Sequence, residues 1–297
     1  MNVNAKLGLI FPEVDIQVDS QSLDVGALES RIAYFATSGA RQELKSPYNF
    51  ASFYLAEKYR DLRRLIYFDT DVIVQGDVAE LGHMGLDGNP IATVEDCSQN
   101  FELYFDFKQL ERMGWTSMWP FYNKAACVFN HGMFVMDTEK WIAANVTVHI
   151  EKWMSRFRDS KGTLYKFGLS QPPWLLALYR RYKKLGYEWN LRGLGRNEFV
   201  ANEKANLASL GFDAEWFRKH GLQGGNRPYV APHSGDAKLL HFNGRYKPWK
   251  ANRHNVGKTT ALCGTELKPC SKIWWSYISP EAENILKPEK LGTADAL

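Results

Sequence analysis

The sequence predicts an α/β fold, and two observations carry that prediction. Residues 65–74 (LIYFDTDVIV) form an apolar run rich in isoleucine, valine and tyrosine, which is typical of a buried strand. Residues 47–59, just before it, repeat apolar side chains with the period of a helix. With 297 residues, of which 45% are hydrophobic, the chain is long enough to bury a substantial core. No linker divides it, so we expect one domain over residues 1–297.

The remaining elements follow from the same patterns. Further strands are expected at residues 14–18, 90–94, 126–137 and 238–249. Residues 126–137 are expected to break into two pieces at Asn130, His131 and Gly132. Further helices, some mixed with loop, are expected within residues 22–38, 100–119, 137–158, 171–179 and the C-terminal tail. Residues 197–232 are polar and rich in glycine towards their end, so they are expected to be the most loop-like stretch.

Asp69 and Asp71 interrupt the apolar run at residues 65–74. Carboxylates inside such a run are costly unless a partner neutralises them. A hard divalent cation prefers carboxylate oxygens and keeps positions for substrate phosphates. An Asp-x-Asp pair is also common in turns, where aspartate bonds to the backbone. The flanking strand favours a metal site at a sheet edge, where α/β proteins bind their ligands.

A second candidate set lies far along the chain, at His241, Gly244 and Lys247. A glycine lets backbone N–H groups approach an anion, and a lysine provides a point charge for phosphate. The alternatives are a histidine satisfied within the core and a solvated surface lysine. Gly132, inside a strand pattern, indicates that a ligand or another backbone segment approaches closely.

Composition excludes several classes of function. A net charge of +4 without a block of lysine and arginine gives no reason to expect nucleic-acid binding. No apolar stretch has the length of a membrane span, and the N-terminus lacks the pattern of a signal peptide. The four cysteines form no zinc pattern, which leaves two disulfides or four buried thiols. A glycosylation sequon at residues 145–147 favours a secretory compartment.

Two motifs taken together resemble glycosyltransferase family 8, which includes glycogenin and bacterial galactosyltransferases. They are residues 67–74 (YFDTDVIV) and residues 241–249 (HFNGRYKPW). Residues 49–56 (NFASFYLA) and 129–137 (FNHGMFVMD) are similar to segments of the galacturonosyltransferase and galacturonosyltransferase-like branch, as are the Pro172–Pro173 loop and residues 189–195.

The resemblance implies a GT-A-like nucleotide-sugar-binding fold with a central mixed sheet flanked by helices. It implies retaining transfer of galacturonic acid or another hexose from a UDP-sugar to a glycan acceptor. Mn²⁺ or Mg²⁺ would be held by Asp69, Asp71 and His241. Such a cation, with a lysine, suits the charge that develops on a leaving diphosphate.

The resemblance also assigns the other site residues. The donor is expected to contact Asp69, Thr70, Asp71, Asn130, Gly132, Gly244 and Lys247. Gln171 is expected beside the anomeric carbon, as the catalytic residue. Because the branch usually has leucine where this chain has Gln171, the identity of the donor sugar stays open.

Two departures from the family accompany these expectations. Ser52 stands where the family usually has a basic residue, which removes a phosphate contact. The N-terminal βα unit that holds the nucleotide base is expected to be missing, because such a start needs roughly 30 residues. One explanation is that the natural chain is longer and carries further sequence, such as a membrane anchor, before Met1. The other is a non-catalytic or weakly active relative that has lost the nucleotide-base pocket and acts as a binding protein.

The resemblance also bears on the cysteines and the compartment. It pairs Cys97 with Cys127, as in the plant-like branch, and leaves Cys263 and Cys270 as a second, weaker pair. Together with the sequon, this predicts the Golgi lumen or secretory pathway. The alternative is a cytoplasmic hexosyltransferase of the lipopolysaccharide type. Residues 101–119 and 197–232 are candidate walls of an acceptor site, although core aromatics under a long loop would explain them equally well.

Overall fold

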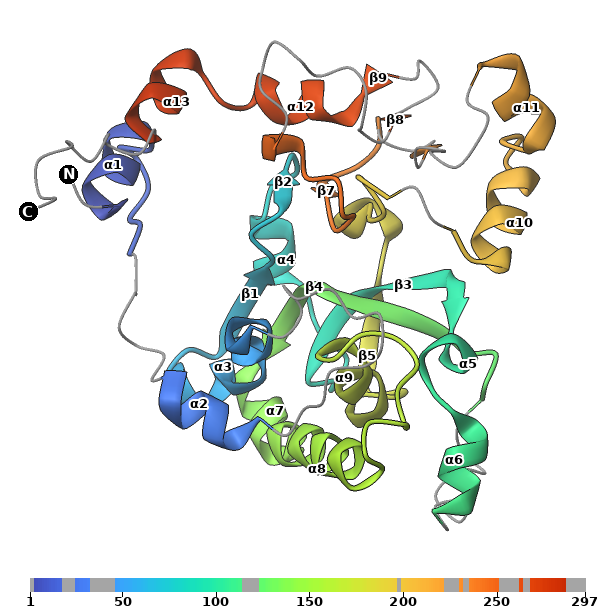
Figure 1. The fold of residues 1–297 in the computed structure, drawn as a ribbon. Coiled ribbons are helices and arrows are strands. Elements are labelled where there is room, and N and C mark those ends of the chain that lie inside the picture. The colour runs from blue at the N-terminus through green and yellow to red at the C-terminus, as the bar shows by residue number, and fades with distance from the viewer. Residues whose placement is uncertain are drawn as a thin grey trace, which may run out of the picture.

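The computed structural model describes residues 3–17, 25–32, 46–113, 123–196, 199–221, 230–231, 235–250, 262–263 and 268–286. A four-stranded sheet with the order β1-β4-β3-β5 lies at its centre (Figure 1). The strands are β1 (Arg64–Phe68), β3 (Ile91–Asn100), β4 (Cys127–Asp137) and β5 (Tyr182–Leu185). β4 is antiparallel to β1 and β3, whereas β5 is parallel to β3. The sheet is therefore mixed, as predicted.

Two smaller sheets complete the strand set of the described residues. β2 (Val72–Val74) pairs antiparallel with β7 (Leu239–His241), and β6 (Val230–Ala231), β8 (Leu262–Cys263) and β9 (Lys268–Pro269) form the other. The run at residues 65–74 is thus two strands in two sheets, not the single strand that was predicted. The change of sheet falls at Asp69 to Asp71, because the backbone of each aspartate bonds to a different neighbouring strand.

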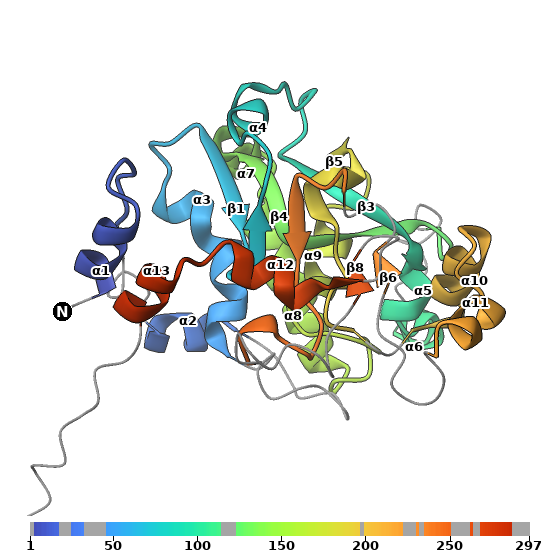
Figure 2. The same cartoon turned by 90° about the horizontal axis from the view of Figure 1, so that it is seen from above.

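Helices cover one face of the central sheet (Figures 1 and 2). An aromatic core lies between these helices and the sheet. The helices are η2 (Pro47–Tyr54), α3 (Leu55–Lys58), α7 (Thr138–Ala143), α8 (Val146–Asp159) and α9 (Gln171–Ala177). Trp174 lies at the centre, with its ring centroid 4.7 Å from that of Phe134 and 5.2 Å from that of Trp141. Burial of side chains this large is the main stabilising contribution of such a layer.

The opposite face of the sheet is covered by shorter elements. These are β2, β7, α4 (Ala79–His83) and the short helix η4 (Tyr187–Asn190), which bury Leu81, Val94, Met133 and Leu239. The other described helices are α1 (Val3–Ile10), α2 (Val25–Arg31), α5 (Phe101–Tyr104), α6 (Phe107–Arg112), α10 (Ala201–Ser209), α11 (Ala214–Lys219), η5 (Pro248–Lys250), α12 (Cys270–Ser276) and α13 (Pro280–Leu286). Within the described parts of the chain, no helix is long and apolar enough to cross a membrane.

Two further predictions about secondary structure are wrong. Residues 11–17 hold no strand, and α1 precedes them; Val14 is 57% exposed, so its alternating pattern has no sheet to pack on. The stretch at residues 197–232 contains α10 and α11. Asp213 caps α11 by accepting from the Trp216 N–H at 2.8 Å, and the two helices bury Leu207 and Phe217 in a small cluster.

β4 is continuous, whereas two pieces separated at residues 130–132 were predicted. The irregularity is instead a shift of register, because Glu95 pairs with Phe129 while Thr93 pairs with Phe134. Residues 130–133 therefore bulge opposite Val94. The side chain of Asn130 holds the bulge by accepting from the Gly132 N–H at 3.0 Å. Bulges of this kind re-aim side chains next to functional sites.

Cys97 and Cys127 form a disulfide with a Cα–Cα distance of 4.4 Å, as predicted. The side chains of Cys263 and Cys270 lie outside the described residues, so the second pair stays a prediction. The disulfide closes a loop of sequence separation 30. We expect the double substitution Cys97→Ser, Cys127→Ser to lower the free energy of unfolding by about 3–4 kcal/mol. Urea denaturation measures this, with the reduced wild-type protein as control; equal stability of the variant and the oxidised wild-type protein would contradict it.

The threonine of the sequon at residues 145–147 has a structural role that does not depend on glycosylation. Thr147 is buried; its hydroxyl accepts from Trp141 Nε1 at 2.9 Å and donates to the Phe53 carbonyl at 2.9 Å. Asn145 is exposed at the start of α8. The motif is therefore weaker support for a secretory compartment than the disulfide.

Candidate functional site

The two aspartates are positioned by different sheets. The Asp69 N–H donates to the Gly132 carbonyl of β4 at 2.8 Å, and the Phe242 N–H donates to the Asp71 carbonyl at 2.8 Å. Thr70 is exposed between them. The carboxylate pair therefore stands at the junction between the central sheet and the β2–β7 pair.

His241 completes a cluster with both aspartates. In the β2–β7 register it lies opposite Val72, so its ring is placed next to Asp71. His241 Nε2 is 3.1 Å from Asp71 Oδ1 and 3.6 Å from Asp69 Oδ2, and one ligand atom of each residue lies within 4.8 Å of the others. Both His241 Nε2 and Asp71 Oδ1 are buried, and among the described residues neither has a polar partner outside this cluster. Buried polar atoms are normally satisfied, so this donor set fits a divalent cation.

Two neighbouring side chains orient these groups, and the sequence analysis gave a role to neither. Asn190 Oδ1 lies 3.0 Å from His241 Nδ1, which leaves Nε2 to face the aspartates. The Tyr67 hydroxyl donates to Asp69 Oδ1 at 2.8 Å. Strand periodicity places Tyr67 on the same face as Asp69 and could have found it. Asn190 carries no local signal, because its partner is 51 residues away.

If His241 binds a cation, we expect Asn190→Ala to weaken Mn²⁺ binding by about 10–100-fold, since the side chain that orients the His241 imidazole is lost. Calorimetric titration with Mn²⁺ measures this. Asn190→Asp keeps the acceptor oxygen and is expected to retain most of the affinity. Equal affinity of the alanine variant and the wild type would show that Asn190 does not orient the ligand.

Because Gly132 has no side chain, the cluster can occupy the space next to its Cα atom. A Cβ at this position would lie 2.7 Å from Asp69 Oδ2 and 2.9 Å from Asn130 Oδ1, and would overlap the ring of His241. The glycine is therefore required by the close approach of the His241 and Asp69 side chains. Asn130 lies at the same place, and its Oδ1 also accepts from Asn190 Nδ2 at 3.4 Å.

Lys247 reaches into the cluster and does not lie in solvent. Its Nζ donates to Asp71 Oδ2 at 2.6 Å and to the Phe242 carbonyl at 2.7 Å. Burial alone raises the pKa of the Asp71 carboxyl, but the interactions with His241 and then Lys247 outweigh it and hold that pKa well below its ordinary value. Burial lowers the pKa of His241, whereas the adjacent Asp69 and Asp71 carboxylates raise it, and the net shift is upward.

The backbone at Gly244 packs directly against the backbone of the loop at Leu194 and Gly195. Its N–H donates to the Leu194 carbonyl at 2.9 Å, and the Tyr246 N–H donates to the Gly195 carbonyl at 3.0 Å. A Cβ on Gly244 would overlap the main chain at Gly195. The glycine is thus explained by the close contact of two loops, and its N–H is already used within the protein.

Gln171 lies at the first turn of α9 with both ends of its amide engaged. Its Nε2 donates to the Phe129 carbonyl, and its Oε1 contacts His131 Nδ1 and accepts from the His131 N–H at 3.3 Å. The His131 ring stacks on Trp174 with a centroid distance of 5.8 Å. Burial lowers the pKa of His131. The side chain of Gln171, from α9, is therefore held against His131 of β4, next to Gly132.

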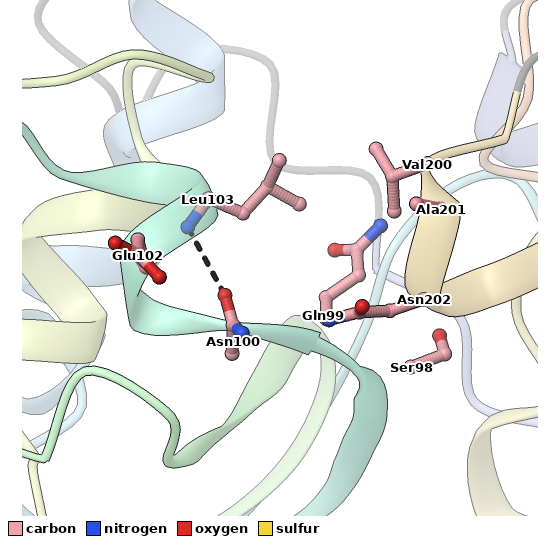
Figure 3. A pocket seen from close by; sticks show the side chains of 8 residues that line it. All are labelled: Ser98, Gln99, Asn100, Glu102, Leu103, Val200, Ala201 and Asn202. Atoms are coloured by element: carbon pink, nitrogen blue, oxygen red, sulfur yellow. Dashed lines mark hydrogen bonds between the residues drawn. The ribbon is translucent and has the colours of Figure 1, made fainter. Parts of the chain in front are cut away.

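The two segments named as candidate acceptor walls meet at a cavity of about 240 Å³ (Figure 3). Glu102 and Leu103 line it from one segment, and Val200 to Asn202 line it from the other. Below it lies a buried ionic network. Glu203 accepts from Arg196 Nη2 at 2.8 Å and from Gln99 Nε2 at 3.0 Å, and Arg192 pairs with Asp96. The network fixes α10 on the end of β3.

This network predicts a pH dependence of stability. Burial alone raises the pKa of Glu203, but Arg196 and then Arg192 outweigh it and hold that pKa below its ordinary value of 4.5. A depressed folded-state pKa contributes stability above the unfolded-state value and loses it as pH falls towards the folded-state value. We expect the free energy of unfolding to fall as the pH drops below about 4.5, and to fall less steeply in Glu203→Gln. Urea denaturation at several pH values measures both slopes; identical slopes would contradict the assignment.

The sequence profile of Glycosyl transferase family 8 matches residues 11–253, which include the cluster of Asp69, Asp71 and His241. The chain belongs to glycosyl transferase family 8. The resemblance found in the sequence is thereby confirmed at the level of the family.

Relatives in this family include the probable galacturonosyltransferase-like 10 of Arabidopsis thaliana, which is 31% identical over 245 residues. Glycosyltransferase 8 domain-containing protein 1 of Danio rerio is 30% identical over 273 residues. These matches cover 82% and 85% of this chain but only 57% and 61% of the relatives. The chain therefore spans about three fifths of the length of these relatives.

The fold is shared with a solved structure of the galactosyltransferase LgtC in complex with donor and acceptor sugar analogues. The TM-score is 0.51 over 96% of this chain and 91% of that one, at 14% sequence identity. At this identity the likeness shows the fold alone. It confirms the GT-A-like fold that the sequence predicted.

Proposed function

We propose that the chain is a retaining glycosyltransferase domain spanning residues 1–297. It would move galacturonic acid or another hexose from a UDP-sugar to a glycan acceptor. Asp69, Asp71 and His241 would hold Mn²⁺ or Mg²⁺. The observation that carries the proposal is the convergence of these three side chains, in which the buried atoms His241 Nε2 and Asp71 Oδ1 have no polar partner outside the cluster among the described residues.

The bound cation would supply positive charge for the diphosphate as it leaves. The chain's own residues would bind and orient the donor. Lys247, which holds Asp71 in this structure, is placed to turn its ammonium group to a phosphate oxygen. Asn190 and Tyr67 keep the ligands aligned, and the absent side chain of Gly132 leaves space beside them. Thr70 and Asn130 are proposed as further donor contacts, whereas Gly244, whose N–H is bonded to the Leu194 carbonyl, is proposed only to allow the close contact of the two loops.

Gln171 is proposed to lie beside the anomeric carbon. The His131–Gln171 unit fixes its amide on β4, and a group held by two partners loses little further conformational freedom when substrate binds. In this proposal the bond between the anomeric carbon and the diphosphate oxygen breaks while the acceptor hydroxyl oxygen bonds to the same face of the sugar, and the proton of that hydroxyl passes to the leaving diphosphate oxygen. The sugar then keeps its anomeric configuration.

We also propose that the protein acts in the secretory pathway, in the Golgi lumen. The Cys97–Cys127 disulfide supports this, because such bridges persist in oxidising compartments and are rare in the cytosol. The glycan acceptor would then be part of a secreted or cell-wall polysaccharide.

A donor panel tests the proposal. Purified protein is incubated with UDP-galacturonic acid, UDP-galactose or UDP-glucose, with Mn²⁺, Mg²⁺ or EDTA, and released UDP is measured. We expect slow hydrolysis of one donor that requires the cation, with NMR showing that the first sugar released keeps the donor's configuration. Binding of a UDP-sugar without hydrolysis or transfer would instead favour a sugar-binding relative. Release of the opposite anomer would exclude retention.

A further inference from the structure

His131 lies in the bulge of β4, directly before Gly132. Its ring is partly buried and stacks on Trp174, with the two ring planes inclined by 21°. Burial is the largest influence on the pKa of His131 and lowers it, and the nearby Asp69 carboxylate opposes this without reversing it. The ring is therefore neutral at neutral pH and carries one proton, on either Nδ1 or Nε2.

Two backbone groups fix the orientation of the Gln171 amide. The His131 N–H, which can only donate, bonds to Gln171 Oε1 at 3.3 Å. The Phe129 carbonyl, which can only accept, takes a hydrogen bond from Gln171 Nε2. Exchanging the two ends of the amide would place two donors together at His131 and two acceptors together at Phe129. The amide oxygen therefore belongs at the His131 end.

This orientation also decides where the ring of His131 carries its proton. Nδ1 contacts Oε1 of Gln171, and an amide oxygen has no hydrogen to give. Nδ1 must therefore be the protonated nitrogen, which leaves Nε2 as an acceptor. The Ser170 hydroxyl lies 3.4 Å from Nε2 and is able to donate to it. The contacts on both sides of the ring thus favour the same tautomer.

The amide of Gln171 has one polar group left for a ligand. The main-chain N–H and the Nδ1–H of His131 occupy both acceptor positions of Oε1. One hydrogen of Nε2 is bonded to Phe129, and among the described residues the other has no partner. Gln171 is therefore arranged to donate an N–H, and its oxygen has no lone pair free for a ligand. Hydroxyl oxygens of a sugar accept such a hydrogen bond.

We propose that His131 is a positioning residue, which holds the amide oxygen of Gln171 so that Gln171 donates an N–H to an oxygen of the donor sugar. The inference rests on the proposed glycosyltransferase function and deepens it by naming the polarity of this contact. Because Gln171 supplies no oxygen to the anomeric carbon, the acceptor hydroxyl reacts there directly, without an intermediate bonded to this side chain.

Nitrogen NMR of the histidine rings tests the tautomer in the whole chain, without any substrate. We expect His131 at neutral pH to have a protonated Nδ1 and an unprotonated Nε2. The loss of its signals in His131→Asn provides their assignment. A ring that carries its proton on Nε2 would overturn the proposal, because Nδ1 would then have no hydrogen for the oxygen of Gln171.

Calorimetric titration in the presence of Mn²⁺ tests the sugar contact. UDP is compared with UDP-galacturonic acid, UDP-galactose and UDP-glucose at about pH 8, where glutamate is ionised. We expect one UDP-hexose to bind more tightly than UDP, and Gln171→Glu to lower that affinity ratio by about tenfold. Glutamate keeps the oxygen and loses the N–H. A Gln171→Glu variant that keeps the ratio, or a wild type that binds UDP and every UDP-hexose equally, would overturn the proposal.

Two variants of His131 separate positioning from folding. His131→Asn places an N–H where Nδ1 stands and should keep most of the ratio, whereas His131→Gln places its amide near Nε2 and should lower the ratio. Lowering by His131→Gln and by Gln171→Glu should not add in the double variant, since both act through one side chain. General damage to the fold would weaken UDP itself and leave the ratio unchanged.

The matched control is His149→Gln, which removes an imidazole from the exposed side of α8 and should keep the whole ratio. Equal ratios in His131→Asn and His131→Gln would show that Nδ1 does not position Gln171. This pair decides the question even if Gln171→Glu does not fold.

Cation-dependent hydrolysis of the same UDP-hexoses is measured in parallel. Hydrolysis together with an affinity ratio that none of these variants changes would reject the inference and leave the enzymatic proposal standing. The expected losses of the ratio without any hydrolysis would reject the enzymatic proposal and leave a sugar contact made by Gln171.

Discussion

Asp71→Ala is expected to reduce cation-dependent hydrolysis of the UDP-sugar by about a thousandfold or more. The substitution removes Oδ1, which faces His241 Nε2, and Oδ2, which accepts from Lys247. One ligand and the anchor of the lysine are therefore lost together. Released UDP with and without Mn²⁺ measures the effect, and the Mn²⁺-induced rise in Tm reports metal binding independently of turnover.

The fold is expected to persist in this variant, because the Asp71 carbonyl still accepts from the Phe242 N–H. Asp61→Ala provides the matched control, since Asp61 is exposed in a turn before β1. It should change neither hydrolysis nor the Mn²⁺-induced rise in Tm. A variant that unfolds, together with a wild type that shows no response to metal, would mean that the acidic cluster serves the fold.

Gly132→Ala is expected to disrupt the same cluster by adding a single methyl group. That methyl would overlap the His241 ring and lie 2.7 Å from Asp69 Oδ2, so the ligands must move apart. We expect a loss of about 1–3 kcal/mol in the free energy of unfolding, as for other overpacked sites. The Mn²⁺-induced rise in Tm should disappear. Urea denaturation and thermal melts with and without Mn²⁺ measure the two effects.

Gly82→Ala is the control for this experiment. A Cβ on Gly82 meets no atom within 4 Å, and the residue lies within α4. Alanine should therefore stabilise the protein by roughly 0.5–1 kcal/mol and leave metal binding intact. If Gly132→Ala also proved neutral, the tight approach of Gly132 to His241 would not exist in solution.

The parts of the fold that strong local patterns encode could be predicted from the sequence. The apolar run before Asp69 and the proline-initiated helix at Gln171 are patterns of this kind. The prediction that residues 197–232 are loop-like was wrong because α10 and α11 are short and polar. These helices are stabilised by caps and by a small apolar cluster. The strand predicted at residues 14–18 is absent from the described residues 14–17. Alternating apolar and polar residues favour a strand only where a neighbouring strand can pair with them.

The candidate site likewise contains residues that could be predicted from the sequence and residues that could not. Asp69, Asp71 and His241 stand out as residue types in an unusual setting, and the structure brings them together. Asn190 and Tyr67 act through contacts with those residues, and the partner of Asn190 comes from a remote strand. Gly244 shows the converse, because a glycine that suits an anion site has its N–H bonded to a neighbouring loop. Residue identity predicted the candidate ligands, whereas only the three-dimensional arrangement shows which side chains hold them in place.

The division of residues 65–74 between two sheets also determines when the candidate site can form during synthesis. Asp69 belongs to an early part of the chain, but β2 pairs only with β7, whose His241 is made 170 residues after Asp71. Closing so long a loop is slow, and domains begin to fold from the N-terminus as they are made. The aspartates therefore emerge long before their third partner. The cluster can be completed only after His241 has been made, so a cation that bound all three residues would stabilise the folded domain and would not nucleate it.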